Sequence, residues 1–323
     1  MKQALILAQG TTVELESPYL RLIPEEELDI FIQETASSEC RIDTLLCANV
    51  SARLRESFYN STNDIQYNAL FTNTSYESLI QKSPLFFEIE KRNPFWGELK
   101  SSNERWGLFS LGCPDVEQGL AHWRSLLNAL LPDDTITHFR FYSSNVLLQM
   151  INASTPQETA WLLGPYAYLI IPVPFSLETS WALVSNPDLE RLSMVELAME
   201  YEPRQEIWWQ VSQKHLDAFQ QVLETIYRRN LLVWLWEEQG DHMRSLYGDG
   251  VELKNFIDDM IEKIRNWGFA THEQQSRCLA ALLPVIAAKA PAEEERRILS
   301  VAEKDPDAAL RQLESLAVRR KPA

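Results

Sequence analysis

The sequence predicts an α/β N-terminal lobe, a mixed sheet with flanking helices, followed by an all-α C-terminal lobe. Strand-like and helix-like patterns alternate between about residues 41 and 172, which indicates a layered α/β arrangement. After about residue 185 the strand patterns stop and amphipathic helical patterns take over. These observations divide the 323 residues into an N-terminal extension over 1–40 that packs on the first lobe, an α/β domain over 41–185 and a helical domain over 186–323.

The extension contains two short strand patterns and one helix pattern. The strand patterns are "ALILAQ" and "TVELES". A helix is predicted for "PEEELDIFIQETA". Pro24 suits its first turn, and the acidic residues that follow favour the positive end of the helix dipole.

In the α/β domain, strand and helix patterns follow one another along the chain. The strand patterns include "IDTLLCAN", "PLFFEIE", "ERWGLFSLG" and "YAYLIIPV". The helical patterns are "SARLRESFY", "SYESLIQKS", "DVEQGLAHWRSLLNALLP" and "NVLLQMI". In the third of these, Asp115 and Gln118 resemble a capping box and Pro132 ends the helix. Its apolar face consists of Leu120, Trp123, Leu127 and Leu130.

The helical lobe is predicted from two long apolar stripes and several capping signals. The first stripe, in "EIWWQVSQKHLDAFQQVLETIYRRN", is Trp208, Val211, His215, Phe219, Val222 and Ile226. The second helix, "VELKNFIDDMIEKIRNWG", ends at Gly268 in the C′ position. Thr271 with Gln274 predicts a capping box for the next helix. Pro291 and Pro306 suit the first turns of two more helices, the second with Asp305 as N-cap.

The composition limits the classes of function. A formal net charge of −16 lacks the overall positive footprint of a nucleic-acid binder. No segment reaches the roughly 18–20 apolar residues of a membrane span, and the apolar run in "MKQALILAQG" is too short for a signal peptide. The four cysteines form no C-x-x-C pair and are expected to be reduced thiols. We therefore expect a cytoplasmic protein with no membrane span and no nucleic-acid partner.

No pattern in the sequence predicts an active site. His272-Glu273 lacks the second histidine of the H-E-x-x-H zinc motif, because Ser276 stands in its place. Ser110 in "GLFSLG" does not fit the G-x-S-x-G elbow, since the spacing is one residue too long. Neither of the two common glycine-rich phosphate loops occurs. We therefore expect no catalytic residue, no metal and no cofactor.

Arg140 is the charged residue within the strand pattern "HFRFY". Alternation places Phe139 and Phe141 on a face that must be buried, and Arg140 on the opposite face. A buried guanidinium needs acceptor groups. We therefore expect Arg140 to be a scaffold residue on a central strand, bonded to a carboxylate or to backbone carbonyls.

Four of the ten tryptophans lie between residues 208 and 236. Trp208 lies on the apolar stripe, so we expect it in the core. Trp209 is one helical step away, and Trp234 and Trp236 flank Leu235, so aromatic surface spreads over more than one helix face. Interface hot spots are enriched in tryptophan. Trp209, Trp234 and Trp236 are therefore candidate partner-binding residues, and at least one should be more than a third exposed.

Several segments together resemble a known family. They are "YNALFTNTSYESLIQKSPLFFEI", "WGLFSLG" and "HWRSLLNALLPDDTITHFRFYSSNVLLQMI", with "LLGPYAYLIIP" downstream. Their order over residues 41–172 resembles the Tap/Tec family of type VI secretion effector adaptors, bacterial chaperones long catalogued as a domain of unknown function. The family's structural motif carries over onto Arg140, Phe141, Tyr142, Val146, Leu147, Gly164 and Pro165. Ser143, Ser144 and Asn145 replace the family's usual Asp-Pro-Arg.

This resemblance implies a non-catalytic adaptor chaperone. Its implied partners are a toxin effector protein and the VgrG spike protein onto which the effector is loaded. Two alternatives remain open from the residues themselves. One is an acidic immunity protein that neutralises a basic toxin. The other is an α/β enzyme without a short-motif signature.

Overall fold

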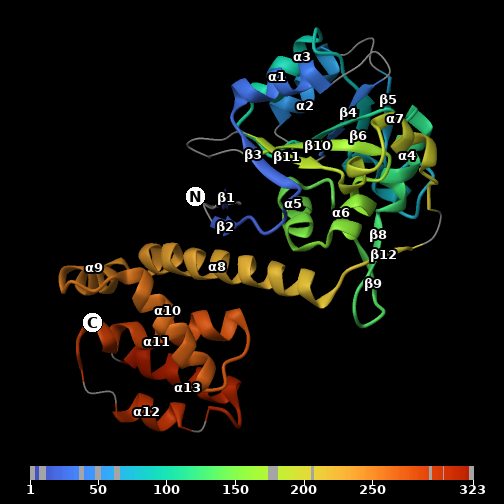
Figure 1. Ribbon diagram of the computed structural model, residues 1–323. Coiled ribbons are helices and arrows are strands. Elements are labelled where there is room, and N and C mark those ends of the chain that lie inside the picture. Colours follow the sequence, from blue (N-terminus) through green and yellow to red (C-terminus); the bar gives the residue numbers. More distant parts are fainter. Residues whose placement is uncertain are drawn as a thin grey trace. The chain divides into compact units, whose positions relative to one another are not determined.

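The structure, a computed structural model, describes residues 4–6, 12–35, 40–47, 52–61, 66–173, 181–204, 207–290, 293–300 and 302–319 (Figure 1). It forms two compact units, Met1–Val222 and Leu223–Ala323. The division lies inside the long helix α8 (Gln213–Glu238). An α/β lobe followed by a helical lobe is thereby confirmed. The finer division into 1–40, 41–185 and 186–323 stays a prediction.

A seven-stranded sheet forms the centre of the first unit. In spatial order its strands are β3 (Leu20–Ile23), β11 (Trp181–Ser185), β10 (Tyr166–Pro172), β7 (Gly107–Gly112), β4 (Arg41–Leu46), β6 (Leu85–Glu88) and β5 (Tyr67–Ala69). Each of the six neighbouring pairs is antiparallel. The large sheet is therefore antiparallel and not mixed. Two further short strands, β1 (Ala4–Ile6) and β2 (Thr12–Glu14), pair with each other.

Mixed pairing occurs in a separate three-stranded sheet. There β12 (Trp209–Gln210) runs parallel to β8 (Asn128–Leu130), and β8 runs antiparallel to β9 (Ile136–His138).

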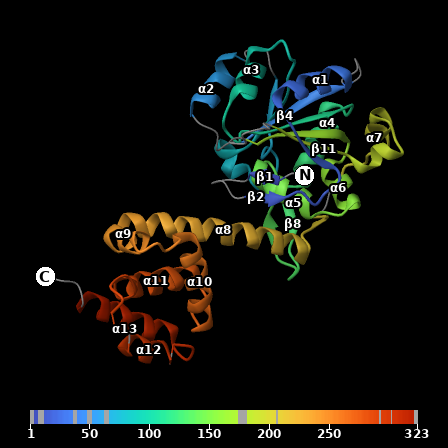
Figure 2. The same cartoon turned by 60° about the vertical axis from the view of Figure 1, so that its left-hand side comes forward.

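Helices cover both faces of the seven-stranded sheet (Figures 1 and 2). One face carries α1 (Glu25–Thr35), α2 (Ala52–Ser61) and α3 (Pro94–Ser101), which share a core with the strands. The other carries α4 (Val116–Ser125), α5 (Ser144–Ala153) and α6 (Pro156–Leu163). The 3₁₀ helices η2 (Glu77–Lys82) and η3 (Pro187–Glu190) and the helix α7 (Met194–Glu200) lie in the connections.

The second unit is helical in all its described secondary structure. It contains the end of α8, then α9 (Gly240–Gly248), α10 (Leu253–Asn266), α11 (His272–Ala287), α12 (Glu293–Leu299) and α13 (Pro306–Arg319). These helices share a core that includes Leu235, Ile261, Leu279 and Leu310. Within the ranges given above, no helix combines the length and apolarity needed to cross a membrane.

Most of the predicted helix ends are confirmed. The Asp115 side chain accepts from the Gln118 N–H, and Thr271 with Gln274 forms a complete capping box. Gly268 follows α10 with a φ of 97°. Asp305 accepts from the Ala308 N–H at 2.9 Å, at the start of α13. Pro291 lies outside the described residues.

Two predicted helices have wrong boundaries, and one cause explains both. The helix expected up to Pro132 ends at Ser125, because residues 128–130 form β8. The helix expected from Glu206 begins at Gln213, because Trp209 and Gln210 pair with Ala129 and Leu130. Pairing between strands far apart in sequence overrides the local helical pattern at both places.

Candidate functional site

Arg140 does not lie on a central strand. It is exposed in a turn that follows the edge strand β9, and its carbonyl accepts from the Ser143 N–H at 2.9 Å. Within the described residues it forms no ion pair. The expected buried scaffold role is therefore wrong. Arg140 does lie opposite the buried Phe139 and Phe141, but the edge strand ends at His138 and the Arg140 side chain is exposed to solvent.

The aromatic residues beside Arg140 are buried. Phe141 stacks on Trp123 with ring centroids 5.3 Å apart. The Tyr142 hydroxyl lies 3.0 Å from Nε2 of His138. Ser143 occupies the N-cap position of α5 without a side-chain capping bond, whereas the Ser144 hydroxyl donates to the Gly107 carbonyl at 2.8 Å. The motif therefore anchors the start of α5 to β7, with its aromatic side chains in the core.

Gly164 and Pro165 end α6 and begin the turn into β10. Gly164 has a φ of 57°, and a Cβ atom there would lie 2.3 Å from the His122 ring. Only glycine fits this left-handed, crowded position. The Gly-Pro pair is therefore explained by packing.

His122 is a buried structural residue. Its Nε2 lies 3.0 Å from the Leu162 carbonyl and its Nδ1 lies 2.8 Å from the Tyr201 hydroxyl. A carbonyl only accepts, so Nε2 carries the proton and Nδ1 accepts from Tyr201. Burial lowers the pKa of His122 to about 3, against the weaker raising effect of the Leu162 carbonyl. The ring is therefore neutral and joins α4, α6 and the segment after α7.

Asp43, like His122, has a strongly shifted pKa. It lies on β4, where Tyr166 donates to Oδ2 at 2.8 Å and Nε of Arg41 donates to Oδ1 at 2.7 Å. Burial raises the pKa of Asp43 to about 6, although both donors oppose the change. Arg41 lies on the same strand as Asp43, and Tyr166 lies on β10, which β7 separates from β4 in the sheet. Neither Asp43 nor His122 lines either of the two grooves described below.

The three candidate tryptophans have different environments. Trp209 is 1% exposed and stacks on Phe139, with ring centroids 6.2 Å apart. Trp236 is partly buried against the core of the second unit. Trp234 is 38% exposed, so the expectation of at least one exposed member is confirmed. Trp208 was expected in the core but is only partly buried. Trp209 is the buried one, because it lies in strand β12 and Trp208 immediately precedes that strand.

Trp234 lines an apolar groove between α8 and α11. The groove has a volume of about 610 Å³. Its α8 wall consists of Leu223, Ile226, Tyr227, Asn230, Leu231 and Trp234. These residues recur at the spacing of one helix face over about three turns. Leu223, at the far end from Trp234, is 60% exposed.

The α11 wall is polar but internally paired. The Arg277 guanidinium contacts the Glu314 carboxylate with two bonds of 2.8 and 3.0 Å, and also reaches Glu273. The His272 ring stacks on Tyr227, with ring centroids 3.8 Å apart. Because these charges already have partners, the groove favours an apolar occupant over a charged one.

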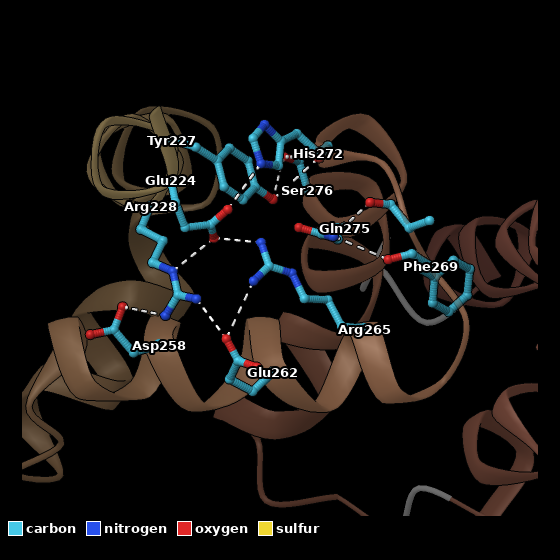
Figure 3. A network of polar contacts seen from close by, with 11 residues as sticks. Glu224, Tyr227, Arg228, Asp258, Glu262, Arg265, Phe269, His272, Gln275 and Ser276 are labelled. Atoms are coloured by element: carbon cyan, nitrogen blue, oxygen red, sulfur yellow. Dashed lines mark hydrogen bonds and ion pairs between the residues drawn. The ribbon is translucent and has the colours of Figure 1, made fainter. Parts of the chain in front are cut away.

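A network of ion pairs joins α8, α10 and α11 (Figure 3), and one of its members, His272, also lines the groove. Glu224 of α8 lies between Arg228 and Arg265 and also faces His272, at 3.2 Å. Arg228 reaches Asp258 at 3.2 Å and Glu262 at 2.6 Å on α10. Burial raises the pKa of Glu224, but hydrogen bonds from Arg228, Arg265 and His272 outweigh it, and the pKa lies below its ordinary value.

A second groove, of about 460 Å³, lies in the first unit near α6 and α7. The Arg204 guanidinium lies over the rings of Trp161 and Trp208, 5.0 and 4.3 Å from their centroids. Trp161 is 39% exposed. Sequence analysis missed this cluster, because Trp161 precedes Arg204 by 43 positions and Trp208 by 47, and no periodic pattern links them. The signal in the sequence that could have indicated this cluster is the polar, proline-containing stretch after α7.

A metal site is absent from the described part of the chain. No three His, Cys, Asp or Glu side chains gather there as a potential ligand set.

Comparison with known proteins gives one match. Residues 45–160 match the family model described as Domain of unknown function (DUF4123). No curated protein and no solved structure matches the chain significantly. The matched range begins within β4, and it includes Arg140, Phe141 and Tyr142. Gly164, Pro165 and the three candidate tryptophans lie beyond it.

Proposed function

We propose that this protein is a non-catalytic cytoplasmic adaptor chaperone that binds a toxin effector of the type VI secretion system and loads it onto the VgrG spike protein. The match over residues 45–160 supports the proposal, because it falls within residues 41–172, which resemble the effector adaptors. The description of the matched family itself states no function.

The observation that carries the proposal is the apolar groove between α8 and α11. Trp234 and Leu223 are large apolar side chains exposed in the same groove. Exposed apolar surface of this kind marks a protein interaction site. Tryptophan is also the side chain most typical of binding hot spots.

The occupant that fits is an amphipathic helix of the effector. The α8 wall is a straight stripe of about three helical turns, which suits a helix lying along it. The charged side chains at its border are paired with one another. An uncharged apolar stripe therefore complements the groove, and a charge on the inserted face would be left without a partner.

Co-purification tests this proposal. A cognate toxin effector should be retained by the tagged wild-type chain from a lysate that contains both. Trp234→Ala should weaken this binding by about 10-fold or more, as expected for a hot spot worth at least 1.4 kcal/mol. Val233→Ala is the matched control, because Val233 is exposed on the same helix but does not line the groove.

Two results would count against the proposal. In one, the wild-type chain retains no toxin. In the other, both variants bind the toxin as the wild type does. That result would show that the groove is not the binding site for the toxin.

The charge distribution favours a second candidate, an immunity protein. Residues 1–222 carry 29 acidic and 15 basic side chains, whereas residues 223–323 carry 17 and 15. The acidity therefore belongs to the first unit, where it would attract a basic toxin. Expression of the toxin alone discriminates the two functions. An immunity protein rescues cells that make the toxin in their own cytoplasm, whereas an adaptor changes only its export.

A further inference from the structure

Two cysteines face each other beside the central strands β4 and β7. Arg41 of β4 pairs with Gly112 of β7, so Cys40 and Cys113 are opposite each other in the same register. Their Sγ atoms are 2.7 Å apart, and both side chains are partly exposed. A disulfide bond is about 2.05 Å long. Only a small side-chain movement therefore separates the two thiols from a covalent bond.

The backbone pairing also suits a bond at this position. The Ile42 carbonyl accepts from Ile89 at 2.9 Å on the β6 side, and the Cys47 N–H donates to Trp106 at 2.6 Å on the β7 side. Odd-numbered residues of β4 therefore bond toward β7. Cys40 and Cys113 come one position beyond the last pair, Arg41 with Gly112, where the alternation predicts a non-hydrogen-bonded pair. In such pairs the Cα atoms are about 4.5 Å apart. Disulfides need about 4.4–6.8 Å between Cα atoms, so this pairing is compatible with a disulfide.

The other two cysteines differ from this pair. Cys47 and Cys278 are buried, and they lie in different units. Burial also raises the pKa of Cys278 to about 12, which keeps its thiol protonated and unreactive. Small oxidants in solution therefore reach Cys40 and Cys113 more readily than Cys47 or Cys278.

We propose that Cys40 and Cys113 form a reversible disulfide that ties β4 to β7 when the protein meets a low-molecular-weight disulfide such as oxidised glutathione. One cysteine thiolate attacks a sulfur of the oxidant, which forms a mixed disulfide and releases one glutathione thiolate. The second cysteine thiolate attacks the protein sulfur of that mixed disulfide and releases the other glutathione. Two protein thiols are oxidised, one glutathione disulfide is reduced to two thiols, and the two protons pass to the released thiolates.

The bond should stabilise the first unit. It joins residues 73 positions apart and so restricts the unfolded chain. We expect the melting temperature to rise by roughly 5–15 °C on oxidation. Dithiothreitol should reverse the rise.

The test uses the intact protein. The folded chain is incubated with oxidised glutathione, its remaining thiols are alkylated after unfolding, and its peptides are mapped by mass spectrometry. The expected result is one cross-linked peptide pair that contains Cys40 and Cys113, with Cys47 and Cys278 alkylated. Cys278→Ser should keep the cross-link and the rise in melting temperature, and Cys40→Ser should lose both.

Two outcomes would overturn the inference. Separate glutathione adducts on Cys40 or Cys113 would show that the second exchange step does not occur. Alkylation of both residues after full incubation would show that neither thiol reacts. Mapping of the wild-type chain decides between these outcomes even if a serine variant fails to fold.

Discussion

The identity of Gly164 is tightly fixed by its surroundings. Its left-handed φ and the His122 ring leave no room for a side chain. Gly164→Ala should therefore lower the free energy of unfolding by about 2–4 kcal/mol, from backbone strain and overpacking together. Gly248→Ala is the matched control, because nothing lies within 4 Å of a Cβ atom there. It should change stability by less than about 1 kcal/mol. Urea unfolding of the two variants measures both effects, and equal losses would contradict the packing argument.

Asp43 makes stability depend on pH in a predictable direction. Its folded pKa of about 6 exceeds the value of 3.8 for an unperturbed carboxyl. The unfolded chain therefore releases this proton first, and the wild type loses stability as pH rises from about 4 to 6. Asp43→Asn removes this titration. The unfolding free energy of the variant minus that of the wild type should rise by about 3 kcal/mol across this interval, then stay level. Parallel stability curves for the two proteins between pH 4 and 7 would show that Asp43 is not perturbed.

At the scale of elements, the Glu224 network fixes α8 against α10 and α11 within the second unit. Glu224→Gln removes the carboxylate shared by Arg228, Arg265 and His272, and should lower the unfolding free energy by about 1–2 kcal/mol at pH 7. Because the folded pKa of Glu224 is depressed, its contribution is present above the unfolded pKa and is lost as pH falls through the folded one. The difference between wild type and variant should therefore shrink below about pH 4. Glu273→Gln, at an exposed ion pair, is the control and should cost less than about 0.5 kcal/mol. A Glu224→Gln variant as stable as this control would rule out a structural role for the network.

The elements also show what the sequence could and could not predict. The amphipathic stripe and the glycine after α10 are local features, and that helix is predicted correctly. The start of α8 is not predicted correctly, because Trp209 pairs with β8, a strand about eighty positions earlier. The prediction for Arg140 is wrong for the same reason, since the end of β9 is set by its pairing with β8. Trp234 could be proposed from its neighbours in sequence, but the groove needs α11, which no local pattern places beside α8.

For the whole molecule, the two units carry different surface chemistry. The first holds the large sheet, the match over residues 45–160 and most of the negative charge. The second holds the apolar groove with Trp234. Under the adaptor proposal, the first unit would suit a basic partner and the groove of the second unit an apolar helix.

The most direct test of the adaptor proposal is the amount of toxin effector retained on immobilised VgrG, with and without this protein. This chain, a cognate toxin effector and a VgrG spike protein are purified and mixed, and the bound fraction of the toxin is measured. The proposal predicts that the toxin is retained only when the chain is present, and that all three proteins then elute together. Equal retention of the toxin without the chain, or a chain that binds neither protein, would contradict it.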